Sequence, residues 1–168
     1  MMTIRKAEED ELPELLRIYK CARTYMKEHG NAEQWGASYP QDVLLREDIR
    51  KGWLYVCVGS DGRPHAVFAF ILGEDPSYRF IEDGCWPDNE PYGTLHRIAS
   101  DGVLKGVFSS VIGYCLSVIP NIRADTHADN HTMLHLFAKY HFVRCGIIHE
   151  ETERIAFQLK AVASPRTN

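Results

Sequence analysis

The sequence lacks the cysteine patterns of zinc-binding and disulfide-linked proteins. Its five cysteines, Cys21, Cys57, Cys85, Cys115 and Cys145, are odd in number and widely spaced, and no two of them form a CxxC pair. A zinc ribbon and a disulfide framework are therefore not indicated, and no metal is expected. The pattern is typical of reduced thiols in the cytosol.

An excess of basic residues is also missing. The chain has 19 Lys and Arg against 23 Asp and Glu, which gives a formal charge of -4. Nucleic-acid binding requires the neutralisation of phosphates, so DNA and RNA are not expected partners. No run approaches the roughly 20 apolar residues of a membrane span, and residues 1–6 contain no apolar signal segment. We therefore expect a cytoplasmic protein without membrane contact.

The composition is that of one ordinary globular domain. The chain has 168 residues, of which 45% are hydrophobic and 25% are charged. This length predicts a single core and leaves little room for a second. We expect one domain over residues 1–160, followed by a polar tail at residues 161–168.

The first third of the chain predicts a strand and two helices. A short strand at residues 3–7 precedes four acidic residues that suit a helix N-terminus. Apolar residues then recur at spacings of three and four, which predicts a buried amphipathic helix ending near Gly30. These apolar residues are Leu12, Leu15, Leu16, Tyr19, Ala22 and Met26. A loop at residues 31–39 and a short helix at residues 42–49 follow.

The middle of the chain predicts a hairpin and a long loop. Residues 53–58 and 65–72 are apolar and β-branched, and the Asp61-Gly62 pair between them is a strong hairpin signal. Residues 73–92 show no period and are rich in acidic and aromatic residues. Loops of this length in a compact domain are usually functional, so this one is expected to be a lid.

The last part of the chain alternates between strands and helices. Strands are expected at residues 94–99, 122–126, 142–148 and 155–159, and helices at residues 103–118 and 130–140. The complete order is β-α-α-β-β-β-α-β-α-β-β.

This order and four short segments resemble the GNAT family of acyl-CoA-dependent N-acetyltransferases. The segments are LHRIAS at 95–100, KGVFS at 105–109, DTHADN at 125–130 and FAKYHF at 137–142. The resemblance implies an α/β (α+β) fold, in which a mixed, mostly antiparallel sheet of about seven strands is flanked by helices and splayed between strands 4 and 5. It also implies acetyl transfer from acetyl-CoA to a primary amine of a small-molecule acceptor, and a possible homodimer.

The expected cofactor site lies where the fourth strand turns into a helix. Unpaired N–H groups at a helix N-terminus suit a pyrophosphate, and Lys105 adds a positive charge. The family pattern is Q/R-x-x-G-x-G/A, but Val103 and Phe108 stand at its first and last positions. The resemblance assigns acetyl-CoA to Ile98, Ala99, Ser100, Leu104, Lys105, Gly106, Val107, Phe108, Ser109, Asn130 and Phe137. The alternative is that Lys105 and Gly106 only cap a surface helix.

Amine acylation needs a group that removes a proton and a group that stabilises the leaving thiolate. Asp125 aligns with an acid that some family members place on the fifth strand, although it could instead pair with Arg97 or Arg123. Phe137 occupies the position of the family's thiol-protonating tyrosine, so Tyr140, three residues further on, is the substitute candidate or a packing residue. His96 is expected to be structural rather than catalytic.

Aromatic and acidic residues concentrate in the two long loops. Those expected to bind the acceptor are Glu33, Trp35, Tyr39, Glu82, Trp86 and Tyr92. Such residues would favour a small cationic amine, unless the aromatics only pack the loops onto the core. Asp83 and Glu90 are further candidates for the base. A non-catalytic acyl-CoA sensor and a protein N-acetyltransferase remain alternatives for the function.

Overall fold

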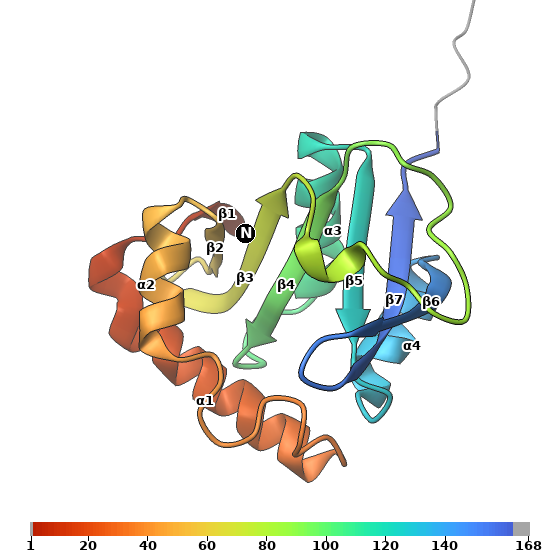
Figure 1. Ribbon diagram of the computed structural model, residues 1–168. Coiled ribbons are helices and arrows are strands. Elements are labelled where there is room, and N and C mark those ends of the chain that lie inside the picture. Colours follow the sequence, from red (N-terminus) through yellow and green to blue (C-terminus); the bar gives the residue numbers. More distant parts are fainter. Residues whose placement is uncertain (1, 163–168) are drawn as a thin grey trace, which may run out of the picture.

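A computed structural model describes residues 2–162, in which seven strands form one sheet (Figure 1). The strands are β1 (Thr3–Lys6), β2 (Leu54–Val58), β3 (Pro64–Leu72), β4 (Gly93–Ser100), β5 (Asn121–Thr126), β6 (Val143–His149) and β7 (Glu153–Lys160). Their order in the sheet is β1-β2-β3-β4-β5-β7-β6. The β4–β5 pair is parallel and the others are antiparallel. The expected mixed sheet is confirmed; most of the tail, residues 163–168, lies outside the described residues.

Helices cover both faces of this sheet. They are α1 (Leu12–Glu28), α2 (Asp42–Arg50), α3 (Val107–Val118) and α4 (His131–Lys139), with short 3-10 turns η1 (Glu9–Glu11) and η2 (Pro76–Tyr78). Leu15 and Tyr19 of α1 are fully buried against β2 and β3, as their helical spacing predicted, and Ile18 is fully buried beside them. On the opposite face, α3 and α4 pack through Phe108 and Phe137.

Helix α3 begins later than the sequence suggested. Its N-cap is Gly106, whose φ of 70° is in the left-handed region that glycine adopts without a side-chain penalty. The residues from Asp101 to Gly106 therefore form a turn rather than the first turn of a helix starting at residue 103. Helix α4 begins after Asn130, whose side-chain oxygen accepts a hydrogen bond from the backbone N–H of Met133 at 3.1 Å.

Strands β4 and β5 pair over only three residues. Gly93 to Leu95 face Ile122 to Ala124, and beyond this point the two strands diverge. On its other side β4 stays paired with β3 as far as Ser100, with a bulge near Arg97, whose φ is 51°. The sheet is therefore forked between β4 and β5.

The segment from Gly73 to Tyr92 is not a lid. Glu82 exchanges two backbone hydrogen bonds with Ile147 of β6, at 2.8 and 2.7 Å. A Cβ on Gly84 would overlap the carbonyl of Cys145, so glycine is needed for this close approach. Figure 1 shows the segment crossing β5 and β7 to reach β6. These backbone contacts attach the segment to the sheet.

A buried histidine joins three elements below the turn that precedes α3. His65 at the start of β3 lies with Nδ1 2.9 Å from Asp101 and Nε2 3.0 Å from Asp61. Arg17 of α1 donates to the same carboxylate oxygen of Asp101 at 2.8 Å. The hydrogen bonds to Asp101 and Asp61 raise the pKa of His65 above its ordinary value of 6.5.

This raised pKa predicts a pH-dependent contribution to stability. A group whose pKa is higher in the folded state stabilises that state fully below its unfolded pKa, here 6.5, and loses the effect as the pH rises through the folded value. We expect the free energy of unfolding of the parent to exceed that of His65→Gln most at pH 5.5, and the gap to shrink toward pH 8.5. Urea titrations of both proteins across this range measure the gap, and a constant gap would contradict the prediction.

Candidate active site

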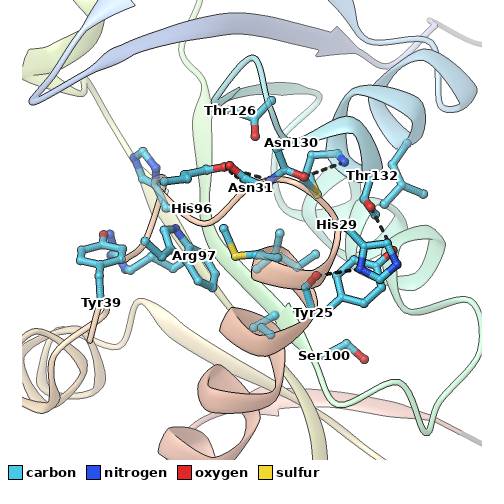
Figure 2. A pocket seen from close by; sticks show the side chains of 18 of the residues that line it. Tyr25, His29, Asn31, Tyr39, His96, Arg97, Ser100, Thr126, Asn130 and Thr132 are labelled. Carbon is cyan, nitrogen blue, oxygen red and sulfur yellow. Dashed lines mark hydrogen bonds between the residues drawn. The ribbon is translucent and has the colours of Figure 1, made fainter. Parts of the chain in front are cut away.

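The fork between β4 and β5 opens into a cavity of about 860 Å³. Residues 95–102 of β4 and the turn after it form one wall, and Ala124 to Thr126 of β5 form another. Helix α1 and the loop after it close one side, and α4 closes the other (Figure 2). This cavity therefore lies where the sheet hydrogen bonding is interrupted.

The open edge of β4 suits an extended ligand. Within the described residues, β4 has no ladder partner on the β5 side after Leu95. An extended chain can pair with such an edge as an added strand would. Four residue steps separate His96 from Ser100, which corresponds to roughly 13 Å of extended chain. The edge can therefore orient a linear, amide-containing group along the cavity.

The N-terminus of α3 adjoins the Ser100 end of this edge. Its first backbone N–H groups have no partner within the helix, and they favour an anion such as a phosphate. Val107 and Phe108 of the first turn line the cavity, as do Asp101 and Gly102 of the turn before it. An elongated ligand with an anionic end and an amide arm, as in acetyl-CoA, fits this combination.

The structure brings most of the predicted cofactor residues to the cavity. Those that line it are Ile98, Ala99, Ser100, Val107, Phe108, Asn130 and Phe137; those that do not are Leu104, Lys105, Gly106 and Ser109. Gly106 nevertheless fixes the start of α3. Leu104 packs on the hydrophobic core, and Ser109 in the first turn of α3 is exposed.

Tyr140 is not placed to act on a ligand. It is not among the residues that line the cavity, and its ring packs on Phe108 with the centroids 5.2 Å apart. Phe108 itself is buried and also contacts Phe137 and Phe142. This placement favours the packing alternative for Tyr140, and the bulky Phe108 belongs to the core as well as to the cavity wall.

A polar cluster lies at the point where the sheet divides. His96 and Asp125 are the first residues after the last paired residues of β4 and β5. Asp125 accepts a hydrogen bond from the Tyr78 hydroxyl at 2.6 Å, and Nδ1 of His96 is 3.8 Å from the same carboxylate oxygen. Nε2 of His96 is 2.8 Å from Asp75. The sequence analysis expected a structural role for His96 and missed its place in this polar cluster. Its position next to the expected splay between strands 4 and 5 could have indicated that place.

Asp125 does not pair with either nearby arginine. Arg97 binds Asp48 of α2 at 2.7 Å, and Arg123 donates to Gln158 at 3.0 Å. Asp125 lines the cavity, as predicted, but its partner Tyr78 comes from the segment that was expected to form the lid.

Burial and hydrogen bonding set the charges in this cluster. Burial opposes ionisation of Asp75, but hydrogen bonds from His96 and Ser77 outweigh it and lower the pKa of Asp75 to about 2. Burial, together with the nearby charge of Asp125, raises the pKa of Tyr78 well above 10. Burial and repulsion from Asp125 also raise the pKa of Glu150. Asp75 is therefore ionised at neutral pH, and Tyr78 is protonated.

The loop between α1 and α2 covers the cavity in place of the expected lid. Gln34 accepts hydrogen bonds from Asn31 at 2.8 Å and from Asn130 at the start of α4 at 3.0 Å. Tyr25 and Thr132 form a second contact between α1 and α4, at 3.0 Å (Figure 2). The opening of the fork is thus spanned by polar contacts.

Half of the predicted acceptor residues are elsewhere. Glu33, Trp35 and Tyr39 line the cavity, but Glu82, Trp86 and Tyr92 do not. The Glu82 carboxylate lies 2.6 Å from His149. The rings of Trp86 and Tyr92 lie 4.1 and 4.0 Å from the guanidinium of Arg123. These aromatics form the satellite packing cluster that the sequence left open as the alternative.

Two buried polar atoms at the cavity have no partner. Within the described residues, the side-chain oxygens of Asn31 and Thr126 are buried without a hydrogen bond, and both residues line the cavity. Acidic residues Glu33, Asp125, Glu150 and Glu151 also line it, and Arg154 is the facing cation without a carboxylate partner among residues 2–162. Unsatisfied buried oxygens and excess negative charge both favour a hydrogen-bond donor.

Two features are absent from the described part of the chain. No helix in it combines the length and apolar character of a membrane span. No group of three or more histidine, cysteine, aspartate or glutamate side chains in it is arranged to hold a metal ion.

Comparisons by family model and by sequence found no match: no protein-family model fits the chain, and no curated protein is significantly similar to it. Solved structures are similar over nearly the whole chain. A GNAT-family acetyltransferase from Streptococcus agalactiae is 28% identical, with 96% of each chain covered and a TM-score of 0.87. A GNAT-family acetyltransferase from Listeria monocytogenes is 16% identical, with 95% of this chain and 94% of that chain covered and a TM-score of 0.68.

A third similar structure contains a ligand. It is a GNAT-superfamily phosphinothricin acetyltransferase from Sinorhizobium meliloti in complex with acetyl-CoA. It is 13% identical, covers 99% of this chain and 92% of its own, and has a TM-score of 0.63. The forked seven-stranded sheet and the likeness to the streptococcal protein along the whole chain lead to one conclusion: this chain has the fold of the GNAT acetyltransferases.

Proposed function

We propose that the protein is an N-acetyltransferase that transfers the acetyl group of acetyl-CoA to a primary amine of a small molecule. The observation that carries this proposal is the unpaired edge of β4, which runs from the N-terminus of α3 to the polar cluster at His96 and Asp125. Pyrophosphate at α3 and pantetheine along β4 would deliver the thioester to the fork. The acetyl-CoA complex of the Sinorhizobium relative supports the same choice of donor.

The chain's own residues would perform most of the positioning. The backbone of residues 98–100 would bind the amides of the pantetheine arm, and the first turn of α3 would bind the phosphates. Acetyl-CoA supplies an activated acyl group when it is bound. The buried floor made by Phe108 and Phe137 would exclude water from the thioester.

The charge of the cavity favours a cationic acceptor. Glu33 lies in the loop that covers the cavity, and Glu150 and Glu151 lie in the turn between β6 and β7. Because these carboxylates outnumber the unpaired cations nearby, an ammonium group would be attracted and a carboxylate repelled. An amine with a second positive charge suits this arrangement best.

A non-catalytic acyl-CoA sensor is the second candidate. It is favoured by Phe137, which occupies the family's tyrosine position, and by the place of Tyr140 outside the cavity. A sensor would bind acetyl-CoA without releasing CoA when amines are added.

Acetyl-CoA should stabilise the folded protein. A ligand that binds only the native state adds about 2.7 kcal/mol at 100 times its Kd, which raises Tm by several degrees. Gly106→Trp should abolish this shift, because the indole would stand beside the first turn of α3. Gly62→Trp is the matched control, since Gly62 also has positive φ and open space around its Cα but lies in the β2–β3 turn. Equal shifts in both variants would contradict the assigned phosphate end.

Tyr140→Phe tests whether the Tyr140 hydroxyl takes part in the reaction. The substitution keeps the ring that packs on Phe108 and removes only the hydroxyl. We expect turnover to change by less than about twofold, because Tyr140 does not line the cavity. A loss of 100-fold or more in a folded variant would restore Tyr140 as the acid that protonates the thiolate.

Glu33→Gln tests the preference for cationic acceptors. An exposed ion pair is worth up to about 1 kcal/mol, so KM for a diamine should rise by roughly two- to fivefold while KM for a monoamine with an uncharged tail stays constant. Glu90→Gln is the control, because Glu90 pairs with Lys160 outside the cavity. Initial rates of CoA release measure both values, and identical changes for the two amines would contradict the charge argument.

A further inference from the structure

We propose that His96 is the group that accepts the proton from the attacking amine, and that Asp75 is its positioning residue. This inference rests on the proposed acetyl transfer. It departs from the sequence-based expectation in two ways, since Asp125 was the predicted base and His96 was expected to be structural. The juxtaposition of His96, Asp75 and Asp125 at the fork carries the argument.

The place of His96 in the fold puts it beside the reacting atoms. A thioester whose arm follows the edge of β4 from Ser100 reaches the fork after four residue steps, and His96 is the first residue there. Figure 2 shows His96 at the cavity, on the strand that also provides Arg97 and Ser100. The imidazole is therefore close to where an amine must stand to attack.

Hydrogen bonding fixes the orientation of the imidazole. Nε2 lies 2.8 Å from the ionised carboxylate of Asp75, so the proton of a neutral imidazole resides on Nε2. Nδ1 then carries the free lone pair. Its distance of 3.8 Å from Asp125 is too long for a hydrogen bond, which leaves this lone pair available to the amine.

Asp125 is less suited to accept the proton. The same oxygen that faces His96 already accepts the short hydrogen bond from Tyr78, whose hydroxyl stays protonated. The side chain of Asp125 is 6% exposed, whereas that of His96 is 17% exposed. Asp125 is thus placed to stabilise the imidazolium once it forms, as a buried anion a few ångströms away.

Three carboxylates surround His96. Asp75 precedes η2, Asp125 is on β5 and Glu150 is in the β6–β7 turn. Asp48 of α2 also senses the charge of His96, and Tyr78 of η2 is neutral. These carboxylates can compensate the positive charge that proton transfer creates. Two cations also lie near: Arg97 is bound to Asp48, and Arg154 acts on Glu150.

The proposed step balances in atoms and charge. The amine nitrogen attacks the thioester carbonyl carbon, the C–N bond forms and the C–S bond breaks, with the bonding electron pair leaving on sulfur. The nitrogen gives up one proton to Nδ1 of His96. The imidazolium then releases this proton to solvent, and the thiolate takes one up from solvent.

The first test compares His96→Gln with His149→Gln. Loss of a positioned base lowers kcat by roughly 100-fold or more, and we expect this for His96→Gln with the Kd of acetyl-CoA unchanged. His149 is a matched control, because it forms the same kind of pair with Glu82 outside the cavity, at 2.6 Å. Equal rates for His96→Gln and the parent would overturn the proposal.

Asp75→Asn separates a positioning role from a purely structural one. Loss of the carboxylate removes a charge that favours the imidazolium, so the acidic limb of the kcat/KM profile should move to lower pH and kcat should fall about tenfold. An unmoved acidic limb would overturn the role of Asp75. If Asp125→Asn abolishes the limb and His96→Gln retains it, Asp125 is the base.

A measurement on the resting protein keeps the inference testable apart from the proposed function. Nitrogen NMR of the histidine side chains should show neutral His96 protonated on Nε2, with that preference weakened in Asp75→Asn. A proton on Nδ1 would overturn the proposal even if the enzyme acetylates amines. Conversely, acetyl-CoA binding without CoA release for any amine would overturn both the acetyl transfer and the base assigned to it, while leaving the tautomer result intact.

Discussion

The early separation of β4 from β5 is the constraint on which the site depends. After three paired residues, the bulge at Arg97 turns β4 away from its parallel neighbour. Two interactions on the α1 and α2 face hold this bulge: Asp48 binds the Arg97 guanidinium, and Tyr19 donates to the Arg97 carbonyl at 2.8 Å. These contacts from α1 and α2 thus help to keep β4 apart from β5.

A forked sheet needs another connection between its halves, and aromatic packing provides it. Phe137 of α4 contacts Phe108 of α3 and Phe157 of β7, with ring centroids 6.1 and 4.6 Å apart. These rings lie in the core that continues under the fork from β3 to β7. A phenylalanine at position 108 therefore supports the two sides of the cavity, which explains a bulky residue where the family pattern has a small one.

The sequence correctly predicted the elements that depend on local residue patterns. Helical spacing located α1, and the Asp61-Gly62 pair located the β2–β3 turn, because both depend on neighbouring residues. Residues 73–92 pack on β6 and β7, some 55 to 80 positions later, and on Asp125 and Arg123 of β5, so the loop's aromatics could not be assigned to packing or to a ligand. The pairing of His96 with Asp75 was hidden for the same reason, and the start of α3 depended on the φ of Gly106.

The polar cluster is an unfavourable arrangement for stability alone. Asp75, Asp125 and Glu150 converge on one imidazole, and the raised pKa of Glu150 shows that burial and repulsion already disfavour a further negative charge. The repulsion among these carboxylates is reduced when the imidazole becomes cationic or when an ammonium group enters the cavity. Because proton transfer from an amine produces the first of these states and acceptor binding the second, the cluster is better adapted to the course of a reaction than to the resting fold.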